Sequence, residues 1–358
     1  MTSTAASAPS SRTPERSTPS GSTVTAGRRA RRRRAGRVVA VLVVLVLGLV
    51  LLSLTVGERI YSPVDVLRVI LGQDVPGASF TVGRLRLPRT ITSVFVGVSL
   101  GLAGTLFQTM LRNPLASPDI IGISFGSSAA AVTAIALFGA GGPVVSFIAL
   151  AGGLLVALVV YALSYRRGVL GSRLVLIGIA VGTMLVAVIN FVLTRTSVYK
   201  AAEALRWLTG SLNSSFWDDA ASMTLAAIIL VPLALLVGRR LEILELGDDS
   251  STALGVPADR TRLIIIVVAV ALVSTATASA GPVAFVAFLA GPIAARLTPG
   301  RSLLVPAALV GAALVLGADF IGSHLLPYTL PVGVVTGAVG APYLLWLLAR
   351  SNRKGGRL

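Results

Sequence analysis

Ten apolar runs, most of them close to 20 residues long, occupy the larger part of this chain and are separated by shorter polar segments. A helix needs about 20 apolar residues to cross the hydrocarbon core of a bilayer. Because lipid offers no hydrogen-bond partners, each run has to satisfy its own backbone groups as a helix. We therefore predict an all-α polytopic membrane protein with about ten transmembrane helices. The predicted spans are residues 38–56, 90–111, 119–138, 144–163, 173–194, 219–237, 262–280, 283–297, 302–321 and 331–349.

The composition excludes several classes of enzyme. Hydrophobic residues make up 54% of the chain and charged residues only 13%, unlike an ordinary soluble enzyme. There is no cysteine, and the single histidine is His324, which leaves little for thiol chemistry or a histidine metal site. The sequence contains neither a G-x-x-x-x-G-K-[ST] phosphate loop nor an H-E-x-x-H motif. We expect no catalytic residues, no cofactor and no metal ligands.

The charge of the chain is distributed unevenly between the two sides of the membrane. The formal net charge is +17, which in a soluble protein would suggest nucleic acid as a partner. In the ten-span topology, however, 23 of the 31 Lys and Arg residues fall on the side of the termini. The positive-inside rule then places both termini in the cytoplasm. We therefore expect membrane lipid rather than nucleic acid as the partner of these charges, in a bacterial cytoplasmic membrane.

The chain divides into a tail, a transmembrane domain and a second tail. Residues 1–36 are rich in Ser, Thr, Pro and then Arg, and we predict a disordered basic cytoplasmic tail. Residues 37–349 form the transmembrane domain, and residues 350–358 form a C-terminal cytoplasmic tail. A cleaved secretory signal is the alternative for the first apolar run. The length of that run and the many spans after it favour a retained helix.

A helix break follows the second span. Arg112, Asn113 and Pro114 end the apolar run, because proline lacks an amide hydrogen and biases the preceding residue away from helical angles. Pro118 follows in the same polar link. Small residues on both sides of the break predict closely packed helices, and they are Gly97, Gly101 and Gly104 before it and Gly122, Ser124 and Gly126 after it.

Few polar residues lie inside the spans. Gln108 and Asn190 are expected to form interhelical hydrogen bonds rather than to bind substrate. Asp119 flanks the helix break, and Asp319 is expected to cap a helix or bond to a neighbouring polar group rather than to relay protons. An ion-coupled secondary transporter usually carries a denser set of polar groups at mid-membrane, so it is the weaker alternative.

The cytoplasmic segment 238–261 combines acids with an apolar face. It holds five of the 14 Asp and Glu residues, and its leucines are not needed in a solvated loop. We expect Gly247 and Gly255 to break it into two short helices. The combination predicts a small folded surface on which a cytoplasmic partner docks.

On the outer side, two short helices and a basic segment are predicted. Ser62-Pro63-Val64-Asp65 starts a helix with an N-cap, a first-turn proline and an acid, and a second surface helix is expected over residues 201–208. Arg86 and Arg89 flank Leu87-Pro88 on what we expect to be a rigid, strand-like segment. Interfacial snorkelling and a basic pocket for the acids of an outside protein are equally compatible with this pattern.

Several stretches together resemble one family, in the order in which that family carries them. They are RLPR (86–89), AGTLFQTMLRNPLASPDIIGIS (103–124), WLTGSL (207–212), LELGDDSSTALGV (244–256), GPVAFVAFLAGPIAAR (281–296), AD (318–319) and LPVGVVTGAVGAP (330–342). The chain resembles the FecCD/BtuC-type permeases, which are the membrane subunits of ATP-binding-cassette (ABC) importers for iron-siderophores, haem and vitamin B12. The resemblance covers about residues 37 to 349.

The resemblance implies a dimer of permease subunits, identical or paralogous, a cytoplasmic ABC ATPase dimer and an extracytoplasmic substrate-binding protein. It also implies inverted repeats, formed by helices two to five and seven to ten, and makes Arg86 and Arg89 contacts for glutamates of the binding protein. It assigns segment 244–256 to ATPase coupling, and the residues expected to carry this role are Leu244, Leu246, Gly247, Asp248, Asp249, Ala253, Leu254 and Gly255.

This sequence departs from the family pattern at two places. The A-P-H-x-A-R stretch common in the eighth helix is AGPIAAR here, which keeps Arg296 but lacks the histidine. The arginine that often follows the AD pair is replaced by Ser323 and His324, so a third outer arginine contact is not expected. From the resemblance we expect a ferric siderophore as cargo, with cobalamin or haem as the alternative, and a pathway lined by the fifth, eighth and tenth helices.

Overall fold

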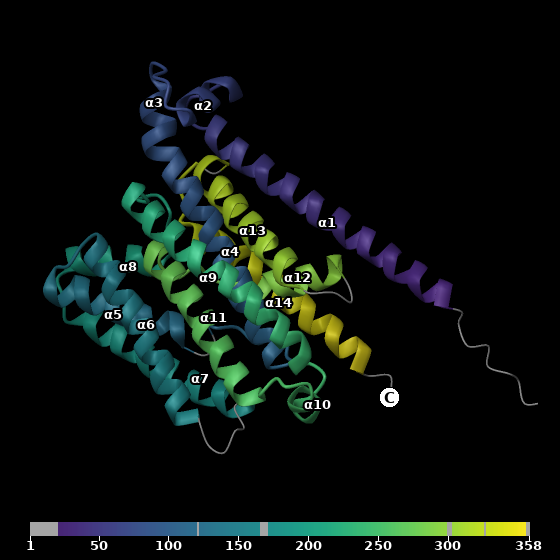
Figure 1. Cartoon of the computed structure of the whole chain (residues 1–358). Coiled ribbons are helices and arrows are strands. Elements are labelled where there is room, and N and C mark those ends of the chain that lie inside the picture. The colour runs from purple at the N-terminus through teal and green to yellow at the C-terminus, as the bar shows by residue number, and fades with distance from the viewer. Residues whose placement is uncertain (1–20, 120–121, 165–170, 299–302, 326, 356–358) are drawn as a thin grey trace, which may run out of the picture.

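The computed structural model describes residues 21–119, 122–164, 171–298, 303–325 and 327–355, and over these ranges the fold contains helices and no strand (Figure 1). Residues 1–20 of the predicted first tail and residues 356–358 of the predicted second tail lie outside the described residues. The elements are α1 (Gly21–Thr55), α2 (Pro63–Ile70), α3 (Ala78–Phe80), a π-helical turn η1 (Thr81–Arg86), α4 (Leu87–Met110), α5 (Ile123–Phe138), α6 (Pro143–Ser164), α7 (Gly171–Thr194), α8 (Val198–Leu208), α9 (Trp217–Leu244), α10 (Asp248–Ala253), α11 (Ala258–Ala280), α12 (Val286–Leu297), α13 (Leu304–His324) and α14 (Val332–Gly355).

An apolar helix lies at each of the ten predicted spans. Among the described residues, seven segments are long and apolar enough to cross a membrane. The other three apolar helices are shorter, at Ile123–Phe138, Val286–Leu297 and Val332–Trp346. These three correspond to the third, eighth and tenth predicted spans. The polytopic all-α fold predicted from the apolar runs is thus confirmed.

Helix α4 is the centre of the bundle and packs against α9, α11, α12 and α13. Its glycines allow this packing. A Cβ on Gly104 would lie 1.7 Å from the carbonyl oxygen of Ala287 in α12, and a Cβ on Gly97 would lie 2.4 Å from that of Gly311 in α13. Because both obstacles are backbone atoms, no side chain can move aside. The close helix packing predicted from these small residues is confirmed.

The two ends of the bundle carry different elements (Figure 1). The start of α1, the end of α14 and α10 lie at one end of the molecule, which we call the α10 end. Helices α2 and α3 lie at the opposite end, which we call the α2 end. Both described chain ends therefore lie on one side, as the even number of spans predicts.

Helix α1 begins earlier than the sequence indicated. Residues 21–36 were expected to belong to a disordered tail, but α1 starts at Gly21 and includes them. Alanine and arginine both favour helix, so the arginine-rich stretch continues the helix of the apolar run. At the other chain end, α14 continues to Gly355 and takes up most of the predicted second tail.

The short helices at the α2 end form as predicted. Helix α2 begins with Pro63 in its first turn, and the Ser62 hydroxyl accepts a hydrogen bond from the Asp65 amide at 3.1 Å. This is the N-cap arrangement that the sequence indicated. The surface helix predicted at residues 201–208 is α8.

Candidate functional site

The predicted coupling segment contains one short helix between two glycine turns. Gly247 (φ 107°) and Gly255 (φ 80°) both adopt conformations that L side chains rarely reach, and they bound the six-residue helix α10. The expectation of two short helices separated by these glycines is wrong. Gly238 does not interrupt α9, so the first of the two expected helices is a continuation of α9.

The coupling candidates fall into a buried set and an exposed set. Leu244 is 3% exposed and belongs to the main hydrophobic core, whereas Leu246 and Leu254 are 64% and 62% exposed. Asp248 is held by Arg262, whose Nη2 lies 2.7 Å from its Oδ1. The remaining candidates, Asp249, Ala253 and Gly255, are exposed, whereas Gly247 is half-buried. A partner at this end would therefore meet Leu246 and Leu254 but not Leu244.

The polar residues at the end of α4 lie beside this segment. Gln108 is buried, and its Nε2 donates to the Phe288 carbonyl in α12 at 2.9 Å. This confirms its predicted role as an interhelical hydrogen-bond partner. The Asn113 side chain accepts from the Leu115 amide at 2.9 Å across Pro114, and Pro118 is buried. Arg112 donates from Nη2 to the Leu244 carbonyl at 2.9 Å.

The carboxylate of Asp119, near the helix break, is hydrogen-bonded to neighbouring serines. Asp119 is half-buried in the link between α4 and α5, where it accepts hydrogen bonds from the hydroxyls of Ser124 (2.5 Å) and Ser117 (3.3 Å). Burial raises the pKa of the Asp119 carboxyl, and the two serine hydrogen bonds lower it. The group is therefore a structural anchor of the break.

At the α2 end, Arg86 is tied to the end of α1. Its guanidinium donates to the carbonyls of Leu54 (3.0 Å) and Arg59 (2.8 Å) and lies over the Tyr61 ring at 5.3 Å. The stretch around it is not strand-like as expected. Thr81–Arg86 forms a π-helical turn that leads directly into α4, because Pro88 is tolerated in the first turn of a helix.

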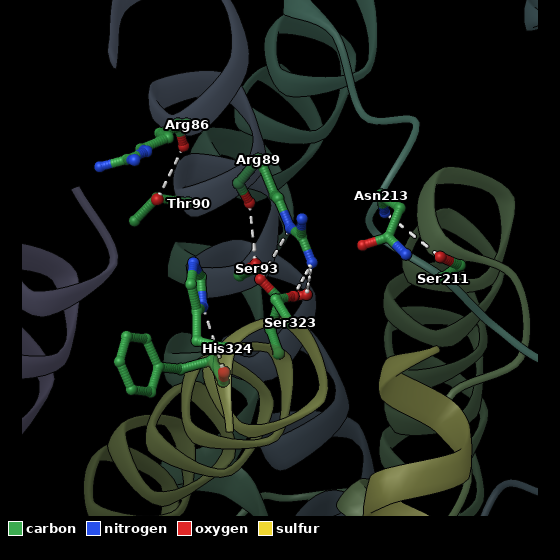
Figure 2. A network of polar contacts seen from close by, with 10 residues as sticks. Arg86, Arg89, Thr90, Ser93, Ser211, Asn213, Ser323 and His324 are labelled. Atoms are coloured by element: carbon green, nitrogen blue, oxygen red, sulfur yellow. Dashed lines mark hydrogen bonds and ion pairs between the residues drawn. The ribbon is translucent and has the colours of Figure 1, made fainter. Parts of the chain in front are cut away.

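Arg89 is tied to the end of α13. Its Nη2 and Nε donate to the two carboxylate oxygens of Asp319 at 2.7 and 2.9 Å, and Nη2 also donates to the Ser323 hydroxyl (Figure 2). The expectation that Asp319 bonds to a neighbouring polar group is confirmed, and the partner is Arg89. His324 stacks on Phe320 with ring centroids 4.8 Å apart.

The sequence did not indicate a cavity of about 800 Å³, lined by parts of α6, α8 and α11 and by turns between helices. Three non-helical turns form one side of it, where the Ser211 amide donates to the Ala280 carbonyl at 2.8 Å and the Gly333 amide donates to the Gly210 carbonyl at 3.0 Å. The only signal in the sequence was glycine at the turns, because Gly210 and Gly281 have φ values of 65° and 69°. The charged residues that line the cavity are Glu203, Arg206, Asp218 and Asp219.

Asn190 lies on α7 and is exposed on the surface of this single chain. No hydrogen bond from its side chain to another described residue is found, so its predicted role inside the subunit is not supported. Thr183 lies seven residues earlier and is also exposed. Residues seven apart lie on one face of a helix, so α7 presents two polar side chains, among exposed apolar ones, away from its own bundle.

Comparison with known proteins decides the family. The model of the FecCD transport family matches residues 43–350. The chain belongs to the FecCD transport family. A FecCD chain is a permease subunit of an ABC transporter, an integral membrane component. Within the described residues, no group of three or more His, Asp or Glu side chains could hold a metal ion.

Individual relatives of this FecCD chain agree with the family match. It is 40% identical over 291 residues to the ferric enterobactin transport system permease protein FepG of Escherichia coli, which covers 81% of this chain and 88% of FepG. It is 37% identical over 305 residues to the achromobactin transport system permease protein CbrC of Dickeya dadantii (84% and 87% covered). Among solved structures, it is similar to a metal-chelate type ABC transporter in an inward-facing conformation, with a TM-score of 0.79, 25% identity and 88% and 99% of the two chains covered.

Proposed function

We propose that this chain forms the gated translocation path of an ABC importer that carries a ferric siderophore across the bacterial cytoplasmic membrane. The observation that carries the proposal is the family match over residues 43–350 combined with relatives whose names specify ferric enterobactin and achromobactin transport. The chain itself supplies no ATP-binding motif, so the free energy comes from a separate ATPase.

The ATPase docks at the α10 end. An exposed leucine on either side of α10 is costly in water but favourable in the cleft of a partner protein. Gly247 and Gly255 hold α10 at an angle to α9 and α11, so Leu246 and Leu254 flank one compact projection. This end is cytoplasmic by the charge count, and both termini lie on the same side.

An extracytoplasmic substrate-binding protein docks at the α2 end, where Arg86 and Arg89 supply positive charge. Both guanidinium groups already have partners in their own chain. A glutamate of the binding protein therefore has to share Arg89 with Asp319, and this competition limits how much affinity the contact adds.

A second permease subunit, identical or paralogous, completes the path. A polar side chain in a membrane span is unfavourable where it contacts lipid. The exposed Asn190 and Thr183 therefore indicate that their face of α7 lines a polar path or contacts a partner subunit. This supports α7 as one pathway helix. Helices α12 and α14 are the other two, since the apolar part of each is shorter than a full span and contains a proline.

The experiment is uptake of iron-55 bound to a siderophore by iron-starved cells with and without the gene. Loss of uptake on deletion, restored by the parent gene but not by a Leu246→Asp/Leu254→Asp variant, supports the proposal. Unchanged iron uptake contradicts the siderophore cargo and leads to cobalamin or haem uptake as the next assay. Uptake that persists without any partner ATPase would instead favour an ion-coupled transporter.

A further inference from the structure

The last turn of α4 ends in a conformation that its sequence does not favour. The Arg112 amide donates to the Thr109 carbonyl at 3.1 Å and the Asn113 amide donates to the Gln108 carbonyl at 3.0 Å, which is the Schellman pattern of helix termination. The residue at the left-handed position of this motif is usually glycine. Here it is Arg112, with φ 50°. A side chain kept at such a position indicates a function for that side chain.

The two polar side chains of this turn hold two different helices. Gln108 lies in the last turn of α4, and Arg112 lies two residues after the end of the helix. Gln108 donates to the Phe288 carbonyl in the first turn of α12, and Arg112 donates to the carbonyl of Leu244, the last residue of α9. One turn of α4 thus links the helix that leads into α10 with a proposed pathway helix.

The contact with α12 is close. Gly291 packs so closely on Gln108 that a Cβ there would lie 2.0 Å from Gln108 Oε1. The residue before α12, Phe285, has φ 64° and is, with Arg112, one of two non-glycine residues with positive φ among the described residues. Its ring lies against Gly340 of α14. Displacement of the α4 turn would therefore displace α12 and α14 together.

The contact with α9 lies immediately before the coupling projection. Leu244 is buried, and only Glu245 and Leu246 separate it from the Gly247 turn. Burial and the Glu242 charge raise the pKa of the Glu245 carboxyl, whereas the Arg112 charge lowers it, so Arg112 also acts on the residue after Leu244. A cavity of about 380 Å³, lined by Arg112, Gln108, Glu245 and Pro292, leaves room for these parts to shift.

We propose that Arg112 and Gln108 are positioning residues that transmit movement of α10 to the pathway helices α12 and α14. Arg112 receives the movement at the Leu244 carbonyl, and Gln108 passes it to the Phe288 carbonyl. This inference rests on the proposed function, because it needs an ATPase bound at α10.

The test uses the full permease in complex with its ATPase, in lipid nanodiscs. Since the chain has no cysteine, a single Leu297→Cys substitution at the exposed end of α12 takes an environment-sensitive fluorescent label without background. The response of the label to ATP and the rate of ATP hydrolysis are compared between four chains, namely the parent, Arg112→Gly, Arg112→Lys and Arg239→Ala. Arg112→Gly suits the left-handed backbone, so folding is retained while the guanidinium is lost. Arg239 is an exposed arginine near the end of α9 and serves as the matched control.

We expect ATP to change the label signal in the parent and in Arg239→Ala. In Arg112→Gly the response should fall by about 5- to 150-fold, the range of an ordinary coupling free energy, while ATP hydrolysis continues. Arg112→Lys should restore part of the response, because one ammonium donor can still reach the Leu244 carbonyl. A full response in Arg112→Gly overturns the inference alone. A parent that binds no ATPase, or whose label ignores ATP, overturns the proposed coupling function and the inference with it.

Discussion

The two ends of this FecCD permease treat their distinctive side chains in opposite ways. At the α10 end, Leu246 and Leu254 are apolar, exposed and without an apolar environment of their own. At the α2 end, Arg86 and Arg89 are charged and already bonded to carbonyl and carboxylate groups of the same chain. The two leucines are therefore not covered by their own chain, whereas the two arginines already have partners in it. Side chains at the first end should contribute to association, and those at the second mainly to stability.

The largest effect is expected at the α10 end. A Leu246→Asp/Leu254→Asp variant should lose ATPase affinity by about 100-fold or more, because apolar anchors in an interface are worth about 2 kcal/mol each. Its thermal stability should stay at the parent value, since both positions are exposed. The measurements are binding of the purified ATPase to the permease in nanodiscs and the unfolding temperature. The buried Leu244→Asp is the contrasting variant, and it should unfold at a lower temperature.

The next effect concerns the ion pair between Arg89 and Asp319. Asp319→Ala should destabilise the fold by about 2 kcal/mol, because it leaves a half-buried guanidinium without its carboxylate. Arg89→Ala should cost a similar amount, and the double variant should cost less than the sum of the two. Thermal unfolding of the parent, the two single variants and the double variant completes this double-mutant cycle. Strictly additive costs would show that the pair contributes nothing and would weaken the contrast between the two ends.

A smaller effect is expected for docking at the α2 end. Arg86→Glu should weaken the affinity for the substrate-binding protein by about tenfold and make the remaining binding more dependent on salt. The reason is that a charge at the rim of an interface mainly changes the association rate and its salt dependence. The control is Arg195→Glu, at an exposed position between α7 and α8. Titration of the binding protein at two salt concentrations measures the effect. Unchanged affinity would mean that Arg86 serves only the fold.

The smallest effect is a pH-dependent one at Asp119. Because burial raises the folded-state pKa of this carboxyl, ionisation costs stability in the folded chain. Asp119→Asn should therefore raise the unfolding temperature slightly at neutral pH. The gain should shrink as the pH falls through the folded-state pKa and vanish below the unfolded-state value near 3.8. A difference that grows on acidification would contradict this assignment.

The sequence predicts the fold well because membrane spans are defined by local length and hydropathy. All ten apolar helices lie where the apolar runs are, and Ser62-Pro63 begins α2 as its capping residues indicate. Within the predicted docking segment, the exposure of each leucine could not be predicted. Whether Leu244 or Leu246 is exposed depends on where α9 ends, and Gly238 does not end it.

Contacts between distant segments could not be predicted from a single sequence. Arg89 and Asp319 are 230 residues apart, and neither carries a local signal for the other. The same holds for Arg112 and Leu244, which are 132 residues apart. The exposure of Asn190 also depends on which face of α7 the bundle covers. The roles of individual polar residues therefore needed the structure, whereas their membership of a membrane bundle did not.

The central claim is that a separate ATPase at the α10 end drives transport through this chain. The most direct measurement is uptake of iron-55 siderophore into proteoliposomes that contain the permease, with binding protein outside, and with ATPase and ATP inside. We predict uptake that requires both ATP and the ATPase and that is lost in the Leu246→Asp/Leu254→Asp variant. Uptake at the parent rate without the ATPase, or in the variant, would contradict the account.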